Sequence, residues 1–316
     1  MSRILRAALT ETINAYPEMP ERAEDLYLLA DRLEDVRRAN LDHNAALVRE
    51  ASRRGAKLVC LSELFAGPYF ALDKNPLWLP LAEDAREGPS IRRMRAVAAD
   101  SKTVIIAPIY EVDARTGRRF DTAVVIDEAG RVLGGYRKTH IPCGTNEQAS
   151  FHETFYYQAS DGGDVPADEG TDANVSDNPY FPVFETSLGK IGIAICYDRH
   201  FEGVVRSLAL GGAEAVLCPA VSFGKKSEEM WEHEFPTDAL RHKLYIGASN
   251  RRGAERPWNV LFYGHSYFVG PEGRLQNSSD HPELVIADLE LDRLIGSDTS
   301  GWNLPRDLRP DIYSKR

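Results

Sequence analysis

The sequence predicts an α/β protein in which mixed β-sheets pack as a sandwich with helices on the outer faces. Short apolar runs alternate along the chain with amphipathic stretches, a pattern typical of layered α/β proteins. Hairpin signals also recur, in which two apolar runs flank a short polar or glycine-containing segment. Because hairpins pair antiparallel strands, the sheets are expected to contain both parallel and antiparallel pairs.

The individual elements follow from these patterns. Helical spacing is clearest at residues 40–54 and about 90–99, and the first of these stretches ends at Gly55, a residue that often terminates helices. Strands that follow a helical stretch are expected at residues 58–61, 103–109, 214–218 and 245–249. Hairpins are expected from residues 123–126 with 132–136, 184–186 with 191–196, and 266–269 with 274–275.

The composition excludes several classes of protein. The chain has 316 residues and a formal net charge of −10, so it lacks the basic surface that binding a nucleic-acid backbone requires. It contains no run of about 18 apolar residues that could span a membrane. Arg3 and Arg6 interrupt the apolar start, and the four cysteines form no disulfide framework. We therefore expect a soluble, cytoplasmic protein whose partner is a small molecule rather than nucleic acid or a membrane.

The domain organisation is expected to be simple. No Pro- or Gly-rich linker divides the chain, so a single domain over residues 1–316 is predicted. Residues 161–179 are rich in Asp, Gly, Pro and Asn and show no periodicity. This segment is either an exposed excursion loop or a lid over an active site.

Several motifs for metal and cofactor binding are incomplete. His152 and His233 each precede a glutamate, as in the zinc-binding helix motif, but Tyr156 and Thr237 stand where the second histidine is needed. Residues 264–268 carry Phe268 where the serine-hydrolase elbow needs a small glycine. Neither a Walker loop nor a dinucleotide-binding glycine motif is present. The sequence therefore predicts no metal and no cofactor.

Cys196 differs from the other cysteines in its surroundings. It closes an apolar run, is followed at once by polar residues 197–200, and precedes a helical pattern. A thiol at such a strand-to-helix turn lies near backbone N–H groups that favour the thiolate. The alternative is a small buried apolar side chain, an interpretation that we accept for Cys60 and Cys218. Cys143, in a polar loop, is expected to have no special role.

A cysteine nucleophile needs a base and a group that stabilises a developing oxyanion, and two residues match these roles. Glu63 follows a predicted strand and is bordered by apolar residues, so partial burial is expected to raise its pKa. Lys138 ends the second strand of a predicted hairpin. Taken singly, Glu63 is equally consistent with a surface or loop-capping glutamate, and Lys138 with an exposed lysine.

At these three segments the sequence resembles the nitrilase superfamily of carbon–nitrogen hydrolases. The resemblance covers nearly the whole chain and rests on Glu63, Lys138 and Cys196 in the contexts SEL, YRKTHIP and ICYD. It implies a four-layer α-β-β-α sandwich with mixed sheets, a Glu–Lys–Cys site and no metal. It also implies a homo-oligomer that associates through exposed helices and the C-terminal segment, about residues 291–316.

Within the superfamily the sequence looks most like β-ureidopropionases and related N-carbamoyl amidohydrolases. Residues 196–200 (CYDRH) are similar to their Cys-x-x-Arg-His run, and residues 152–157 (HETFYY) to a segment with a second glutamate. The resemblance implies that Glu153 positions Lys138 or the attacking water, and that His200 shapes the substrate pocket. Asp198 replaces a glycine of that group, the spacing from Lys138 to Glu153 is longer, and the acidic segment 161–179 is also long for that group.

The resemblance further implies a mechanism and a substrate class. Cys196 attacks a carbamoyl carbonyl after losing its proton to Glu63, while Lys138 and the N–H of Tyr197 hold the oxyanion. Arg199 either binds a substrate carboxylate or forms an ion pair with Asp198 or Glu202. The substrate expected from this resemblance is N-carbamoyl-β-alanine. The alternatives are an aliphatic amidase, a nitrilase, an N-carbamoylputrescine amidohydrolase and a non-catalytic scaffold of the same fold.

Overall fold

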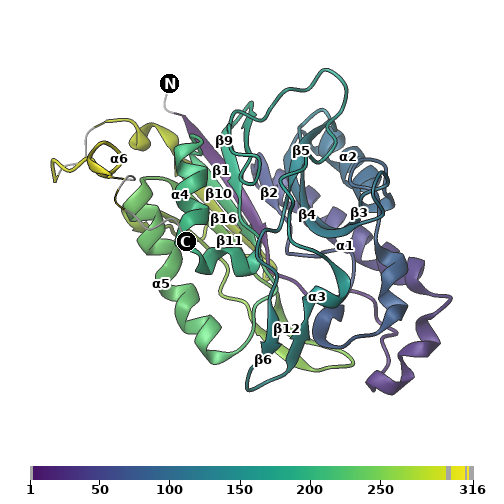
Figure 1. Ribbon diagram of the computed structural model, residues 1–316. Coiled ribbons are helices and arrows are strands. Elements are labelled where there is room, and N and C mark those ends of the chain that lie inside the picture. The colour runs from purple at the N-terminus through teal and green to yellow at the C-terminus, as the bar shows by residue number, and fades with distance from the viewer. Residues whose placement is uncertain (1–2, 297–299, 310–311, 313–316) are drawn as a thin grey trace.

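Two six-stranded sheets form the centre of the computed structural model, which describes residues 3–296, 300–309 and 312 (Figure 1). The first sheet has the strand order β16-β1-β2-β3-β4-β5. Its strands are β1 (Ile4–Thr10), β2 (Leu58–Cys60), β3 (Val104–Val112), β4 (Arg119–Ile126), β5 (Val132–Arg137) and β16 (Leu284–Glu290). Strands β1, β2 and β3 are parallel and the others pair antiparallel, so the sheet is mixed as predicted.

The second sheet repeats this arrangement, with the strand order β15-β14-β11-β10-β9-β8. Its strands are β8 (Val183–Thr186), β9 (Gly189–Ile193), β10 (Ala215–Pro219), β11 (Tyr245–Ser249), β14 (Tyr267–Gly270) and β15 (Gly273–Arg274). Strands β9, β10 and β11 are parallel and the outer strands are antiparallel. Two small hairpins pair β6 (Cys143–Thr145) with β7 (Ser150–His152), and β12 (Arg252–Glu255) with β13 (Val260–Tyr263).

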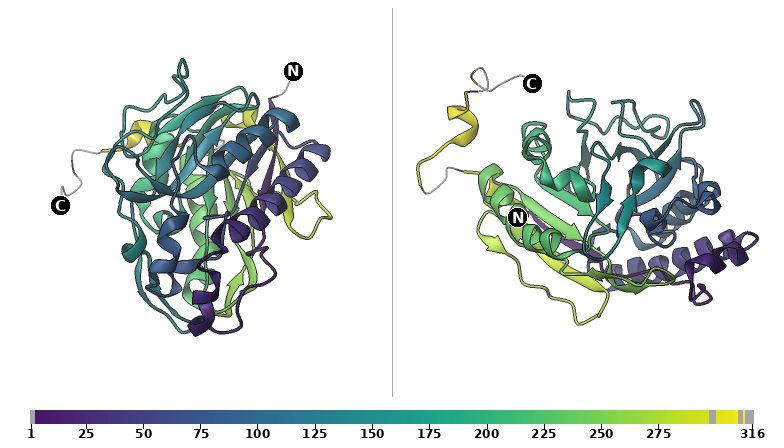
Figure 2. Two further views of the ribbon diagram at one scale, coloured as in Figure 1. Left: turned by 90° about the vertical axis from the view of Figure 1, so that its right-hand side faces the viewer. Right: turned by 60° about the horizontal axis from the view of Figure 1, so that its bottom comes forward.

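Helices cover the outer face of each sheet. The longer ones are α1 (Leu33–Arg53), α2 (Pro89–Ser101), α4 (Glu202–Leu210) and α5 (Lys225–His242), and the short ones are α3 (Glu153–Tyr156) and α6 (Leu304–Asp307). Figure 1 shows α4 and α5 on one side of the strands and α1 and α2 on the other, and the right panel of Figure 2 shows the same separation from another side. The order helix, sheet, sheet, helix confirms the predicted four-layer sandwich.

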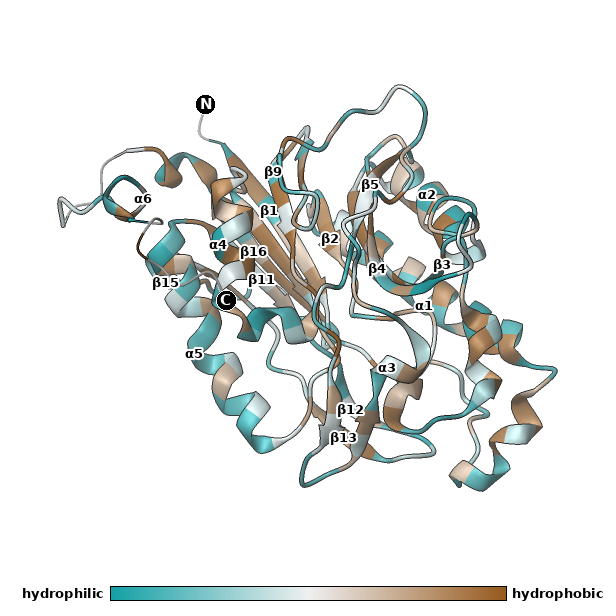
Figure 3. Cartoon of the chain, viewed as in Figure 1, coloured by the Kyte–Doolittle hydropathy of each residue, from teal (hydrophilic) through white to brown (hydrophobic). Residues whose placement is uncertain are grey.

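Side-chain alternation explains why the central strands are apolar on both faces. In β2, Leu58 and Cys60 join the core cluster that the two sheets share, whereas Val59 joins the cluster formed with α1 and α2. Because successive side chains of a strand point to opposite faces, a sheet covered on both sides needs apolar residues at every position. Figure 3 accordingly shows hydrophobic colouring along β1, β2 and β16, while α5 is mostly hydrophilic.

Most predicted elements are confirmed, and the differences have physical reasons. The three predicted hairpins form as β4–β5, β8–β9 and β14–β15. The first long helix ends where expected, because Gly55 takes φ +89°, but it begins at Leu33 rather than at residue 40. Strand β9 ends at Ile193, so Cys196 lies beyond the strand in a 3-10 helix, Cys196–His200. No hairpin signal indicated β16, since it pairs with β1 at the opposite end of the chain.

The C-terminal segment, residues 291–316, is only partly described, because residues 297–299, 310–311 and 313–316 lie outside the described residues. Its described part exposes the large apolar side chains Ile295, Trp302, Leu304 and Ile312. Its expected role in oligomer contacts stays a prediction. Within residues 3–296, 300–309 and 312, no helix combines the length and the apolar composition that crossing a bilayer requires.

Truncation in the shared core should destabilise the protein strongly. Leu217 of β10 is completely buried in the cluster that both sheets share. Leu217→Ala is expected to lower the free energy of unfolding by about 2–5 kcal/mol, because it removes apolar burial and leaves a cavity. As a control, Leu28 is 59% exposed, and Leu28→Ala should change that energy by less than about 0.5 kcal/mol. Urea denaturation measures both, and equal losses would contradict the assigned core.

Candidate active site

The strands of both sheets deliver the predicted site residues to one edge. Strands β2 and β5 run in the same direction, since β3 is parallel to β2 and two antiparallel steps then lead to β5. Glu63 follows the end of β2, and Lys138 follows the end of β5 directly. In the second sheet, Cys196 follows β9 and Val221 follows β10, which is parallel to β9. The topology therefore gathers residues that are distant in sequence at the carboxyl ends of four strands.

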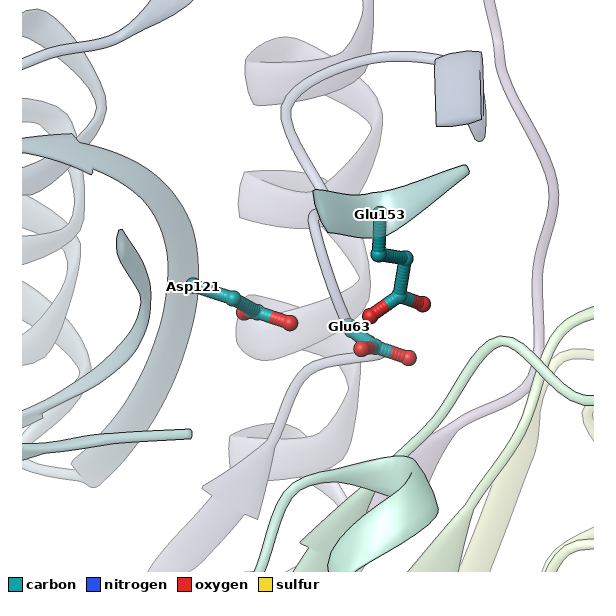
Figure 4. A group of neighbouring side chains, drawn as sticks. All are labelled: Glu63, Asp121 and Glu153. Atoms are coloured by element: carbon teal, nitrogen blue, oxygen red, sulfur yellow. The ribbon is translucent and has the colours of Figure 1, made fainter. Parts of the chain in front are cut away.

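The ammonium group of Lys138 lies at the centre of the site. Its Nζ donates to Glu63 Oε1 and to Glu153 Oε2, both at 2.7 Å, and lies 3.5 Å from Asp121 Oδ2. All four side chains are almost completely buried, and Figure 4 shows the three carboxyl groups pointing toward one another. Three converging carboxyl groups are also a plausible donor set for a metal ion. Here the lysine ammonium takes the position of the cation.

Glu63 remains a carboxylate within this cluster. Burial alone would raise its pKa, but the charge of Lys138 and the hydrogen bonds that the carboxylate receives outweigh burial and lower the pKa. Oε2 of the same carboxylate also accepts the backbone N–H of Val221, at 2.6 Å. The expectation of a net increase in the pKa of Glu63 is therefore wrong. The sequence did not reveal that Lys138 would bind the same carboxylate.

The pKa values of the other three groups of the cluster, Lys138, Asp121 and Glu153, are all raised. Burial would lower the pKa of Lys138, but the charges of Glu153 and Glu63 raise it well above its ordinary value, so the ammonium is retained. Burial raises the pKa of Asp121 well above its ordinary value, and the charge of Glu63 adds to this effect. Burial also raises the pKa of Glu153, although Lys138 opposes it and Tyr69 donates a hydrogen bond of 2.8 Å. Among the three carboxyl groups, the environment of Asp121 therefore favours the protonated form most strongly.

Cys196 is buried at the same edge, in an unusual backbone conformation. Its φ of +49° lies in the left-handed region, which non-glycine residues seldom adopt and which is often found at functional sites. Its Sγ lies 3.6 Å from the carbonyl oxygen of Val221 and 3.6 Å from Ser222 Oγ. Burial raises the pKa of the thiol to about 12, and the negative charge of Glu63 adds to this effect. The expectation of a thiolate favoured by backbone N–H groups is therefore wrong for the free protein.

The residues that hold the site together were missed by sequence reasoning. Val221 connects two of the predicted site residues, because its N–H binds Glu63 and its carbonyl faces Cys196. Asn250 receives the N–H of Ser222 at 2.8 Å and so fixes this loop. Arg251 donates to the carbonyl oxygens of Glu63 and Leu64, both at 2.9 Å. All of these contacts use main-chain atoms, which a side-chain motif does not reveal.

A pocket of about 420 Å³ opens above Cys196. Its walls are built from loops at the carboxyl ends of the strands and from the first turn of α5. The lining residues that the sequence singled out are Glu153, Cys196, Tyr197, Arg199 and His200. Residues 161–179 contribute nothing to this lining. That segment instead connects edge strands of the two sheets, because Asp168 N–H donates to Val132 and Glu185 N–H to Ala173, which supports the excursion-loop interpretation over the lid.

Arg199 and His200 are both anchored to α5. The guanidinium of Arg199 donates to the carbonyl of Cys196 at 2.8 Å and to Ser227 Oγ at 2.9 Å, and it lies 3.4 Å from the carboxylate of Glu234. His200 Nδ1 lies 2.6 Å from the other oxygen of Glu234. The ion-pair partner of Arg199 is therefore Glu234 rather than Asp198 or Glu202. Arg199 nevertheless faces the pocket, with its Nη1 4.0 Å from Cys196 Sγ.

The thiol of Cys196 lines the pocket, and the carboxylate of Glu63 and the ammonium of Lys138 are buried close to it, behind the pocket lining. These are the groups that hydrolysis through a thioester requires, and they define a class of cysteine-dependent hydrolases. Comparison with known proteins agrees with this class. Residues 36–296 match the profile of the family described as carbon-nitrogen hydrolase. The chain belongs to this carbon–nitrogen hydrolase family and is an enzyme, which confirms the resemblance to the nitrilase superfamily.

Individual proteins to which the chain is similar include amidohydrolases and a solved carbon-nitrogen hydrolase, in agreement with the family. N-carbamoylputrescine amidase of Arabidopsis thaliana is 33% identical over 281 residues, which cover 84% of this chain and 86% of the relative. Beta-ureidopropionase of the same plant is 29% identical over 329 aligned positions, covering 99% of this chain and 72% of the relative. The crystal structure of a carbon-nitrogen hydrolase from Helicobacter pylori G27 has a TM-score of 0.76 and 25% identity, covering 99% of this chain and 97% of that one.

The protonation of Cys196 can be tested by alkylation. Only the thiolate reacts with iodoacetamide. Because the pKa of Cys196 is raised to about 12, its alkylation should be slow at pH 7 and rise about tenfold per pH unit through the alkaline range. Peptide mass spectrometry in a Cys143→Ser background follows Cys196 without interference from the exposed Cys143. A plateau of the rate near neutral pH would show that the free protein already holds a thiolate.

Proposed function

We propose that this enzyme hydrolyses the C–N bond of N-carbamoyl amino compounds, with N-carbamoyl-β-alanine as the preferred substrate and β-alanine, carbon dioxide and ammonia as products. The observation that carries the reaction type is the convergence of Glu63, Lys138 and Cys196 beneath one pocket. Relatives named N-carbamoylputrescine amidase and beta-ureidopropionase support a carbamoyl group as the reacting part. The cations Arg199 and Lys226 in the pocket lining favour a carboxylate on the substrate.

The geometry supports a two-stage mechanism. Glu63 takes the proton of Cys196 while Sγ attacks the carbamoyl carbon, and the ammonium of Lys138 and the N–H of Tyr197 stabilise the oxyanion. Collapse of this intermediate breaks the C–N bond, and Glu63 returns the proton to the departing ammonia. Glu63 then takes a proton from water, which attacks the thioester and releases the thiol. The carbamate that is formed decomposes to carbon dioxide and the free amine.

The pKa directions explain why base and nucleophile must act together. The pKa of the thiol is raised and that of Glu63 is lowered, so complete proton transfer before attack is unfavourable. Transfer of the thiol proton to Glu63 becomes favourable only while the C–S bond forms. The sulfur electron pair then enters the new bond, and the negative charge moves to the carbonyl oxygen of the substrate. A cation close to the base, such as Lys138, can stabilise that charge in a site from which water is excluded.

A substrate with a cationic tail is the second candidate. Glu147 also lines the pocket, and its carboxylate accepts the backbone N–H of Lys225 at 2.6 Å. A carboxylate at this position is suited to an ammonium group, as in N-carbamoylputrescine. The named relative with 33% identity is consistent with this candidate.

Replacing the nucleophile tests the proposed reaction. Cys196→Ala should lower the rate of ammonia release by about 10⁴-fold or more, because no other group can form the thioester. The fold should be retained, since the change removes one sulfur atom at the surface of a pocket. The matched control Cys143→Ser changes an exposed cysteine outside the pocket lining and should keep full activity. Undiminished ammonia release by Cys196→Ala would overturn the assignment.

The charge of the substrate tail can be tested with a panel. Ammonia release is measured for N-carbamoyl-β-alanine, other N-carbamoyl amino acids, N-carbamoylputrescine, simple amides and nitriles. Lys226→Ala should raise the KM for carboxylate substrates about 1.4- to fivefold, because an exposed ion pair contributes about 0.2–1 kcal/mol. Lys225→Ala alters an adjacent exposed lysine outside the pocket lining and should leave KM unchanged. A preference for N-carbamoylputrescine, with no effect of Lys226→Ala, would favour the cationic candidate.

A further inference from the structure

Asp198 is a completely buried carboxylate that accepts four hydrogen bonds. Its Oδ2 accepts from the hydroxyl of Tyr136 at 2.6 Å and from the backbone N–H of Ile195 at 3.1 Å. Its Oδ1 accepts from the backbone N–H of His140 at 3.0 Å and from His140 Nδ1 at 2.8 Å. Four donors approach the capacity of a carboxylate, so this buried charge is fully satisfied.

The donors have a common feature, which is their position next to catalytic side chains. Tyr136 and His140 lie two residues before and two residues after Lys138. Ile195 directly precedes Cys196. One carboxylate therefore binds both sides of the Lys138 segment, which follows strand β5 of the first sheet, and the start of the Cys196 turn, which follows β9 of the second.

A ring contact reinforces the same connection. The imidazole of His140 stacks on the ring of Phe201, with centroids 3.7 Å apart and planes inclined by 10°. Phe201 directly follows the 3-10 helix Cys196–His200 that carries the thiol. The side chain of His140 is thus held by Asp198 at one edge and by Phe201 on one face.

We propose that Asp198 is a positioning residue that fixes the Cys196 thiol relative to the Lys138 ammonium by binding the backbone and side chains beside both of them. This inference rests on the proposed function in its assignment of Cys196 and Lys138 to catalysis. Both oxygens of Asp198 are engaged by protein donors, and the residue does not line the pocket, so it acts on the reaction through its neighbours and not through the substrate. A displacement of about 1 Å between reacting groups can lower a rate about 10²-fold.

The substitution Asp198→Asn separates this role from size and burial. The amide keeps one accepting oxygen but presents an NH₂ group to two of the donors, so at least two hydrogen bonds are lost. We expect kcat to fall about 10²-fold in protein that is still folded at the assay temperature. Tyr136→Phe removes a single donor to Asp198 and should lower kcat about three- to tenfold, without depending on whether Asp198→Asn folds.

Asp127 provides the matched control. It is also buried, and it accepts hydrogen bonds from Ala129 N–H and from the N–H and Nε of Arg131 at 2.8–2.9 Å. It lies at the turn between β4 and β5, at the opposite end of that hairpin from Lys138. Asp127→Asn should therefore lower the melting temperature but keep kcat within about threefold of the unaltered enzyme.

Alkylation gives a readout that does not depend on catalysis. If Asp198 holds the thiol in its buried position, Asp198→Asn exposes the thiol and its pKa falls from about 12 toward the ordinary value. Alkylation of Cys196 at pH 8 should then rise at least about tenfold, whereas Asp127→Asn should leave the rate unchanged. The alkylation rate tests the position of the thiol whether or not Cys196 is the nucleophile. If Cys196→Ala retained activity, the proposed function would be wrong, but the alkylation result would still test the role of Asp198.

Two results would overturn the positioning role. One is a folded Asp198→Asn or Tyr136→Phe enzyme with kcat and Cys196 alkylation both equal to those of the unaltered protein. The other is an equal loss of kcat in Asp127→Asn at a matched loss of melting temperature, which would mean that any buried aspartate has this effect. Loss of hydrolysis in Cys196→Ala together with either result would leave the proposed function intact.

Discussion

The buried ammonium of Lys138 is the constraint on which the site depends. A charge without solvent is costly unless oppositely charged groups and hydrogen bonds surround it. Lys138 meets this condition only because Glu63 follows a strand of the same sheet and Glu153 comes from a short helix nearby. Removing Lys138 would leave the buried Glu63 and Glu153 without their shared cation, and removing either glutamate would take one of the two ion pairs from the ammonium. The ion pairs therefore fix the positions of the groups that the proposed reaction needs, and the fold must supply them at one edge.

The same constraint sets the protonation of the neighbouring groups. The charge of Lys138 favours the ionised form of Glu63, whereas burial and the charge of Glu63 raise the pKa of Asp121 and favour its protonated form. The ionised Glu63 in turn disfavours a thiolate at Cys196, which burial already opposes. The resting site thus holds a carboxylate beside a protonated thiol. Such a pair is unreactive until a substrate carbonyl accepts the sulfur electrons, which protects the buried cysteine from reaction in the empty pocket.

Features that depend on neighbouring residues in the chain could be predicted from the sequence. Features that depend on contacts between distant segments could not. Periodicity and hairpin signals located most strands of the two sheets, with β1 and β16 as the exceptions, and the strand-to-helix turn singled out Cys196. The long-range pairing of β16 with β1 left no local signal. The pKa directions of Glu63 and Cys196 also depended on neighbours more than 50 residues away along the chain. Val221 and Arg251 act through main-chain atoms, so their roles required coordinates.

Catalysis and specificity are separated in this arrangement. The groups of the proposed reaction are buried, and Lys138 binds both Glu63 and Glu153, so a change among them is expected to affect every substrate alike. The rim of the pocket is different, because Glu147 and Lys226 are exposed and lie on a loop and on the first turn of α5. Substitutions at the rim can exchange the charge that meets the substrate tail without disturbing the ion pairs below. This separation explains how one buried site is compatible with carbamoyl substrates whose tails carry opposite charges, and it places the choice between them at the rim.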